Sequence, residues 1–283
     1  MNTSATDISN LVASHYTEGS LLGRIEAGLT KLGKSVDNVS LKDLAPVEEF
    51  HTGGRVATKA LLDQLSLTEQ HQVLDVGCGL GGSSRFAASE YGCQMTGVDL
   101  TTEFIESGLV INQWVGLAQK IELLLGSATE LNLNESRFDH AFMLHVGMNI
   151  EDKQAVMSNV YRALKPGGCF AVYDMMRVGD AELQLPVPWA SQPHANAIAP
   201  PETYRDAFTA AGFSLIAERN RKDFALEFFA KVKAQNAEND GPPPIGIHVV
   251  MGDNAALKVK NVLSCMTEGG IAPVEMIGQK SVE

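Results

Sequence analysis

The sequence predicts an α/β fold in which helices cover both faces of a seven-stranded, mostly parallel sheet. Short runs of apolar and β-branched residues alternate with longer segments of helical periodicity, the order that places parallel strands beside crossover helices. A glycine-rich turn follows the first run and an aspartate ends the second. In doubly wound folds, ligands bind at this carboxyl edge of the sheet. The 283 residues suffice for one large domain with added segments.

The predicted elements follow one another in βα order. Residues 1–50 predict a helical N-terminal cap, because apolar residues recur at helical spacing from Ile8 to Leu32, with an acidic connection at 43–50. The turn Thr52-Gly53-Gly54 opens a further helix. Strands are expected at 73–77, 94–98, 120–125, 138–144, 169–174, 213–218 and 271–277. Helices are expected at 82–91, 102–118, 151–164 and 201–211.

Two segments interrupt this alternation. Residues 177–201 contain five prolines and follow the carboxyl end of a strand, which predicts a lid loop over a ligand crevice. Residues 222–269 predict a helical insertion before the last strand. The core domain is therefore expected at residues 51–221 and 270–283.

Composition and charge limit the kinds of partner that the protein is expected to bind. The formal net charge of −12 argues against nucleic-acid and anionic-membrane surfaces. No run approaches the ~20 apolar residues of a membrane span, and residues 1–10 lack signal-peptide features. The sequence contains no C-x-x-C pair, so we expect no metal site. The thiols are expected to be reduced at all four cysteines, which are Cys78, Cys93, Cys169 and Cys265. We expect a soluble, cytoplasmic monomer or homodimer that acts on a small molecule.

The stretch from Val73 to Gly82 reads V-L-D-V-G-C-G-L-G-G. Glycines at such a strand–helix turn permit positive φ angles and let a ligand approach the backbone. The helix that follows presents unpaired N–H groups. Asp99, at the end of the next strand, is placed to accept hydrogen bonds from ribose hydroxyls. The plain alternatives are an ordinary structural turn and a helix cap.

Four motifs in this order resemble the class I S-adenosylmethionine-dependent methyltransferases, which have a Rossmann-like fold. They are the D-x-G-x-G-x-G-G loop, Asp99, Gly126-Ser127-Ala128 and the L-K-P-G-G sequence of residues 164–168. The resemblance covers roughly residues 50–220 and implies S-adenosyl-L-methionine as the cofactor. A glycine-rich turn alone would also fit NAD or FAD enzymes.

The resemblance also implies the cofactor-binding residues. Asp75 would fix the loop near the amino group of the donor, and Leu100 would pack near the adenine. The turn at Thr52 and Gly53 would lie near the donor carboxylate, a role that its backbone concavity also suits. The complete set is Thr52, Gly53, Asp75, Gly77, Cys78, Gly79, Gly81, Asp99, Leu100, Ser127, Ala128 and Leu144.

A narrower likeness concerns His15-Tyr16, the Thr52-Gly53-Gly54 turn and Leu144-His145. These resemble the phosphoethanolamine and the sarcosine/dimethylglycine N-methyltransferases. In those families a tyrosine of the N-terminal helix and a histidine after the fourth strand face each other across the donor methyl. The resemblance thus implies that Tyr16 and His145 are the base or orienting pair and contact substrate. The lid around Trp189 and the insertion differ from both families, so substrate identity does not carry over.

The expected activity is methylation of a small amine, of the glycine, sarcosine or dimethylglycine kind. Histidine has an unperturbed pKa of ~6.5, which suits removal of an acceptor proton near neutral pH. Trp189 suits a pocket wall for an ammonium group, with Met148 and His194 as further substrate contacts, or it is a hydrophobic plug. For His51 we expect a structural role.

Three other functions remain open from the sequence. One is an O- or C-methyltransferase of a hydroxylated natural product. Another is a protein that binds S-adenosylmethionine without turnover. The third is a nicotinamide-dependent dehydrogenase.

Overall fold

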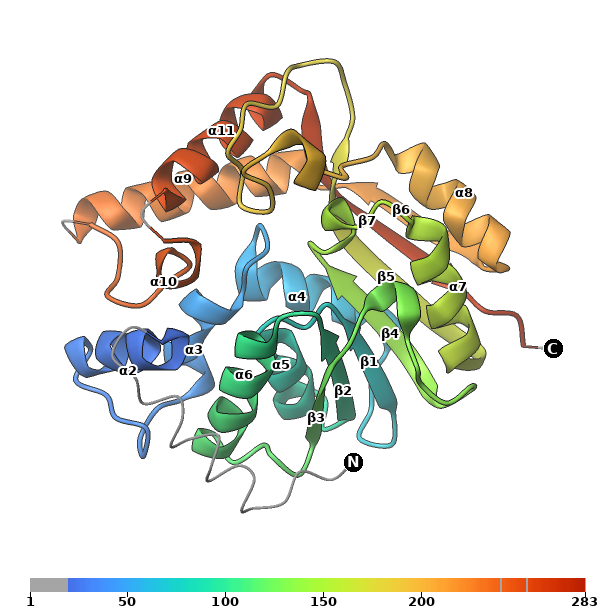
Figure 1. Cartoon of the computed structure of the whole chain (residues 1–283), viewed down its shortest axis with the longest axis horizontal. Helices are drawn as coiled ribbons and strands as arrows, with labels where there is room; N and C mark the ends of the chain where they lie inside the picture. Colours follow the sequence, from blue (N-terminus) through green and yellow to red (C-terminus); the bar gives the residue numbers. More distant parts are fainter. Residues whose placement is uncertain (1–19, 240, 253, 283) are drawn as a thin grey trace.

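A seven-stranded sheet forms the centre of the computed structural model, which describes residues 20–239, 241–252 and 254–282 (Figure 1). Its strand order is β3-β2-β1-β4-β5-β7-β6, and only β7 runs antiparallel to its neighbours. The predicted fold class is therefore confirmed. The strands are β1 (Gln72–Val76), β2 (Gln94–Asp99), β3 (Ile121–Leu125), β4 (Phe138–Leu144), β5 (Leu164–Arg177), β6 (Ser214–Asn220) and β7 (Ile271–Gln279).

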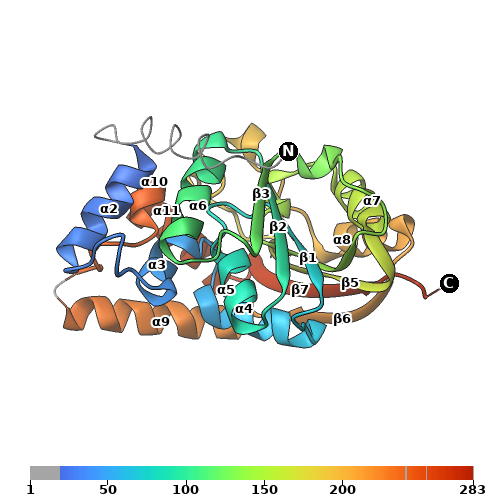
Figure 2. The same cartoon turned by 90° about the horizontal axis from the view of Figure 1, so that it is seen from below.

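Helices connect the strands and cover both faces of the sheet (Figure 2). The α-helices are α2 (Leu21–Lys31), α3 (Leu41–Glu48), α4 (Gly54–Leu62), α5 (Gly82–Glu90), α6 (Thr102–Trp114), α7 (Lys153–Ala163), α8 (Pro201–Ala211), α9 (Lys222–Glu238), α10 (His248–Met251) and α11 (Ala255–Thr267). Short 3₁₀ turns are η1 (Asp63–Leu65), η2 (Ala128–Glu130), η3 (Gly147–Asn149) and η4 (Pro193–Ala195). Among the described residues, no helix has the length and apolarity needed to cross a membrane.

Alternation along β1 shows how the two core layers form. Leu74 and Val76 point to the face covered by α7 and α8, where they join a cluster that includes Tyr204. Val73 points to the opposite face, toward residues of α4 and α5. Successive side chains of a strand point to opposite faces, so each strand contributes to both layers. These strands pair in parallel, so the carboxyl ends of β1, β2, β4 and β5 lie along one edge of the sheet.

The N-terminal helices and the insertion pack against each other on one side of the sheet (Figure 1). Leu22 and Ile25 of α2 share an apolar cluster with Ile245 and with residues of α6. Arg24 donates a hydrogen bond to the carbonyl of Val249, which is 225 residues away in sequence, at 3.2 Å. The division into a cap, a core and an insertion remains a prediction.

Two segments differ from the structure in the kind of element that was predicted. The supposed acidic connection at 43–50 is largely α3, which begins with a capping box between Ser40 and Asp43. The residues Lys165–Gly168, expected as a turn before a strand, belong to β5 itself. β5 begins early because Leu164 pairs with Phe138 of β4, and the register then shifts before Cys169 pairs with His140.

Candidate active site

The glycine-rich turn is hydrogen-bonded to the end of β2. The amides of Gly77 and Cys78 both donate to the carbonyl of Val98, at 2.8 and 3.1 Å. The amide of Gly79 donates to Oδ2 of Asp99 at 2.9 Å. The turn and the Asp99 carboxylate therefore form one hydrogen-bonded unit at the carboxyl edge of the sheet.

Glycine is required at two positions of this turn. Gly77 has a φ of 73°, and a Cβ there would lie 2.4 Å from Cγ2 of Val146, which is an impossible contact. Gly79 also has positive φ, and a Cβ there would lie 3.3 Å from the ring of Phe50. The turn is thus packed closely between the segment after β4 and the end of the N-terminal region.

Asp99 sits between two exposed apolar side chains. Its Oδ1 accepts a hydrogen bond from the amide of Thr101 at 2.9 Å. An ionised carboxylate can accept about four hydrogen bonds, so lone pairs remain for ligand hydroxyls. Leu100 is 69% exposed, and Leu125, the register partner of Asp99, is 58% exposed. A carboxylate flanked by open apolar surface suits the ribose and base of a nucleoside.

The remaining expected adenine contacts lie just beyond β3. Ser127 Oγ accepts a hydrogen bond from the amide of Thr129 at 3.2 Å and lies 2.7 Å from its hydroxyl. Ala128 is buried in the core beside α7. The Ser127 side chain thus caps η2, and its contact with adenine remains a prediction.

Asp75 is a buried carboxyl group beneath the turn. Its Oδ2 accepts a hydrogen bond from Ser84 Oγ at 2.7 Å. Burial raises the pKa of Asp75 to about 7, opposed by Ser84 and reinforced by the charges of Asp99 and Glu49. A cation bound nearby would favour the ionised form, so Asp75 can respond to a ligand ammonium group.

Cys78 is a packed residue of the turn. Its side chain is buried, and a Cβ on Gly97 would lie 2.8 Å from the Cys78 sulfur. Burial raises the pKa of this thiol well above its usual value. The thiol is therefore a poor nucleophile.

His145 follows β4 directly and has an unusual backbone conformation. Its φ of 53° is in the left-handed region, which costs about 1–3 kcal/mol in a non-glycine residue and is commonest at functional sites. Its amide donates to the carbonyl of Tyr173 at 2.7 Å. Its Nε2 is buried and has no hydrogen-bond partner among the described residues. Tyr16, its predicted partner, lies outside the described residues, so that pairing stays a prediction.

Three rings gather at this edge of the sheet. The His145 ring lies 5.1 Å from that of Tyr173 and 6.0 Å from that of His51, between centroids. The His51 and Tyr173 rings are 6.3 Å apart. Tyr173 is buried, and its hydroxyl donates to the carbonyl of Thr52 at 3.0 Å. We refer to His51, His145 and Tyr173 as the ring cluster.

Sequence reasoning missed two residues of this region, Tyr173 and Glu49. Tyr173 pairs with Leu144 across β4 and β5, so the register of two adjacent carboxyl ends could have indicated it. Glu49 was assigned to a connection, although its carboxylate is buried against Thr58. Its role depends on contacts between separate segments, for which the sequence has no local signal.

The Thr52–Gly53 turn lies against the insertion. Thr52 is buried beside Tyr173. Gly53 has a φ of 94°, and a Cβ there would lie 2.5 Å from the ring of Phe224 in α9. Gly53 thus allows α9 to approach the site, and contact of this turn with a ligand carboxylate remains a prediction.

The described contacts do not join the lid candidates to the ring cluster. Trp189 donates from Nε1 to Asn196 at 2.9 Å and packs with residues of the insertion. His194 is exposed in η4. Met148 is buried, and its carbonyl accepts from the amide of Ala197 at 2.9 Å. Their roles in substrate binding remain predictions.

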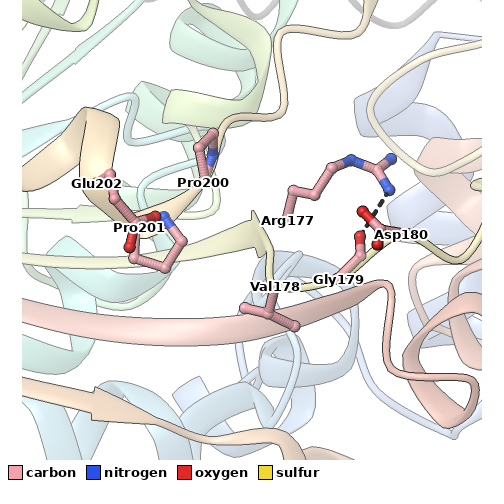
Figure 3. Close-up of a pocket in the computed structure, with 7 residues that line it drawn as sticks. All are labelled: Arg177, Val178, Gly179, Asp180, Pro200, Pro201 and Glu202. Atoms are coloured by element: carbon pink, nitrogen blue, oxygen red, sulfur yellow. Dashed lines mark hydrogen bonds between the residues drawn. The ribbon is translucent and has the colours of Figure 1, made fainter.

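A pocket of about 370 Å³ lies where β5 ends and α8 begins (Figure 3). Its rim includes Arg177, whose Nη1 donates to the carbonyls of Gly179 and Ala181 at 3.4 and 3.0 Å. Arg177 is four residues beyond Tyr173 on β5, or ~13 Å at 3.3 Å per residue. The pocket is therefore separate from the ring cluster. We place the candidate active site at the ring cluster.

Comparison with known proteins agrees with the class that the motifs indicate. Residues 74–172 match the family described as Methyltransferase domain. The match covers 99 of the 283 residues and agrees with the resemblance that the motifs indicate.

Curated relatives include N- and C-methyltransferases. Phosphoethanolamine N-methyltransferase 1 of Triticum aestivum is 32% identical over 126 residues, covering 44% of this chain and 25% of the relative. Glycine/sarcosine/dimethylglycine N-methyltransferase of Actinopolyspora halophila is 25% identical over 187 residues, covering 66% and 33%. Sterol 24-C-methyltransferase of Eremothecium gossypii is 27% identical over 193 residues, covering 62% and 50%. The matches thus span a quarter to a half of these relatives.

A solved structure extends the likeness in fold to almost the whole chain. It is Haemonchus contortus phosphoethanolamine N-methyltransferase 2 in complex with S-adenosyl-L-methionine. The two chains are 19% identical and superpose with a TM-score of 0.69, covering 97% of this chain and 60% of the other. At this identity the comparison establishes the fold alone.

Proposed function

We propose that this protein is an S-adenosylmethionine-dependent methyltransferase that methylates a small molecule, most favourably an amine. The observation that carries the proposal is the glycine-rich turn, which is hydrogen-bonded to the Asp99 carboxylate within a methyltransferase domain. The narrower acceptor class rests on the ring cluster and on the N-methyltransferases among the relatives.

The residues present fit the cofactor. Asp99 has lone pairs for the ribose hydroxyls, and Leu100 offers exposed apolar surface for the adenine. Asp75 is a carboxyl with a pKa of about 7, which a ligand ammonium group would convert to the ionised form. When bound, the cofactor supplies an electrophilic methyl carbon that the acceptor attacks.

The protein's own contribution is alignment and control of the acceptor proton. Holding two reactants in line can contribute ~7–11 kcal/mol. An amine must lose its ammonium proton before it can attack, and a hydroxyl must lose its proton during attack. Burial lowers the pKa of both His51 and His145, so both rings are neutral at pH 7 and available as proton acceptors.

A C-methyltransferase is the second candidate. A sterol 24-C-methyltransferase is among the relatives, 27% identical over 193 residues that cover 62% of this chain. An apolar acceptor would need an apolar pocket, and Trp189 of the lid segment packs against an apolar cluster that includes Met175. The two candidates differ in the acceptor atom and share the cofactor site.

Two experiments test the proposal in sequence. A thermal-shift comparison of S-adenosyl-L-methionine with NAD should show stabilisation by the former alone, and stabilisation by NAD alone would refute it. A panel of small amines, hydroxylated compounds and sterols, with methyl-labelled cofactor, should then yield S-adenosylhomocysteine and a labelled amine. Cofactor binding without turnover on any acceptor would instead support a non-catalytic binding protein.

A further inference from the structure

We propose that His51 removes the acceptor proton through its Nδ1, and that the buried Glu49 positions this ring and stabilises its protonated form. This inference rests on the proposed function and assigns a role within the same site. It differs from the expectation for the sequence, in which His145 is the base and His51 is structural.

The Nε2 atom of His51 faces two oxygens that can only accept hydrogen bonds. The carbonyl oxygen of Gly54 lies 3.1 Å away and Oε2 of Glu49 lies 3.4 Å away. An unprotonated Nε2 would place its lone pair against both oxygens, which is repulsive. A protonated Nε2 donates to the carbonyl and attracts the carboxylate.

The neighbouring hydroxyl group of Thr58 supports the same tautomer. Its Oγ1 lies 2.9 Å from Nε2 of His51 and donates its own proton to Oε2 of Glu49 at 2.9 Å. The hydroxyl therefore presents a lone pair, not a proton, to the imidazole. In the neutral ring the proton then resides on Nε2, and Nδ1 carries the free lone pair. Nδ1 makes no hydrogen bond with any described residue.

Both carboxyl oxygens of the buried Glu49 accept hydrogen bonds from its neighbours. Its side chain is only 3% exposed, and Oε1 accepts from Nε of Arg55 at 3.2 Å. A carboxylate on one ring nitrogen fixes the tautomer and stabilises the imidazolium when the other nitrogen takes a proton. For His51, burial lowers the pKa and the charge of Glu49 opposes that decrease.

His145 has no such support. Its Nε2 is buried without a partner in the described part of the chain, and the charged groups acting on it there do not include a carboxylate. Burial and the neighbouring His51 hold the pKa of His145 well below its usual range. Tyr173, the third ring, donates its hydroxyl proton to a backbone carbonyl. Of the cluster's two histidines, only His51 has a carboxylate among the described residues to balance an added proton.

The proton moves from the acceptor to His51. The N–H or O–H bond of the acceptor breaks, its electron pair stays on the acceptor atom, and the proton goes to Nδ1 of His51. That electron pair then forms the new bond to the methyl carbon, while the bond between this carbon and the sulfur of the donor breaks and its electron pair goes to the sulfur. After the product leaves, Nδ1 releases the proton to water and the neutral tautomer returns.

The first test uses NMR of the full chain with ¹⁵N-labelled histidine and no ligand. We expect His51 to carry its proton on Nε2, and Glu49→Gln to lower the His51 pKa while His248 on α10 titrates as in the wild type. A proton on Nδ1, or a His51 pKa that is unchanged by Glu49→Gln, would overturn the inference. This test needs no turnover, so its outcome is independent of the proposed function.

The second test compares pH profiles once an acceptor is known. His51→Asn should lower kcat by about 10²-fold or more, a typical contribution of a general base, and remove the ionisation on the acidic side. The matched variant His248→Asn should retain the wild-type kcat and the ionisation on the acidic side. If kcat of His51→Asn stays within a factor of two and keeps the same profile, the inference is wrong. If His51→Asn does not fold, the NMR measurement of the His51 tautomer and pKa tests the inference by itself.

Discussion

Asp174 provides a direct test of how burial controls charge in this fold. The carboxyl is fully buried on β5, where Oδ2 accepts from the hydroxyl of Tyr204 at 2.6 Å. Burial raises its pKa from 3.8 to about 7, against the opposing effects of Tyr204 and Lys153. We predict that Asp174→Asn, which keeps an acceptor for Tyr204 but cannot ionise, becomes progressively more stable than the wild type as pH rises.

The magnitude follows from linkage. Because the folded carboxyl retains its proton to higher pH than the unfolded one, stability falls as pH rises from about 4 to about 7. A tenfold difference in acidity between the folded and unfolded carboxyl corresponds to ~1.4 kcal/mol, so the full effect approaches ~4 kcal/mol. Between pH 5.5 and pH 8, the wild type should lose ~2 kcal/mol of unfolding free energy through this carboxyl. The difference in unfolding free energy between variant and wild type should therefore grow by about that amount.

Urea denaturation at several pH values between 5.5 and 8 measures this difference. Using the difference cancels the contributions of the histidines and of Asp75, which titrate in both proteins. The exposed Asp37 offers a control, because Asp37→Asn should differ from the wild type by a constant amount. A difference for Asp174→Asn that stays constant across this range would refute the reasoning.

Three further predictions concern the turn and its support. Gly77→Ala should destabilise the fold by ~1–3 kcal/mol and abolish S-adenosylmethionine binding, because of its positive φ and the contact with Val146; calorimetry showing wild-type affinity would contradict this. Leu100→Ala should leave stability within ~0.5 kcal/mol, since the side chain is 69% exposed, yet weaken cofactor binding about tenfold; unchanged affinity would exclude the adenine contact. Glu48→Gln should cost ~3–5 kcal/mol in urea denaturation because it leaves Arg85 buried without its carboxylate, and a loss below ~1 kcal/mol would show that the pair is dispensable.

The sheet and the glycine-rich turn were predictable because their signals are local. Apolar runs separated by helical segments predict parallel strands, and the ends of parallel strands meet at one edge. The proximity of Gly79 and Asp99 follows from that geometry, and the structure places them in hydrogen-bond contact. The antiparallel last strand was not specified, since an apolar run of this length fits either direction.

The buried polar groups were not predictable, because the sequence does not show which side chains will bury them. Glu48 is buried in a salt bridge to Arg85, which is 37 residues away. Without knowledge of this partner, the acidic residues of α3 suggest an exposed connection. Glu49 and His51 bind Thr58 of the neighbouring α4, and His51 also packs against Tyr173 of the distant β5. A charged residue in sequence is expected at the surface unless a partner is known, and the fold alone reveals that partner.

The proposed activity is tested most directly by methyl transfer from labelled S-adenosyl-L-methionine to a panel of small amines, hydroxylated compounds and sterols. The account predicts a labelled amine and one S-adenosylhomocysteine for each methyl group transferred, with both lost in Asp99→Ala. A labelled sterol or hydroxylated product in place of the amine would contradict the acceptor class. The absence of any product, in a protein that binds the cofactor, would contradict the proposed catalysis.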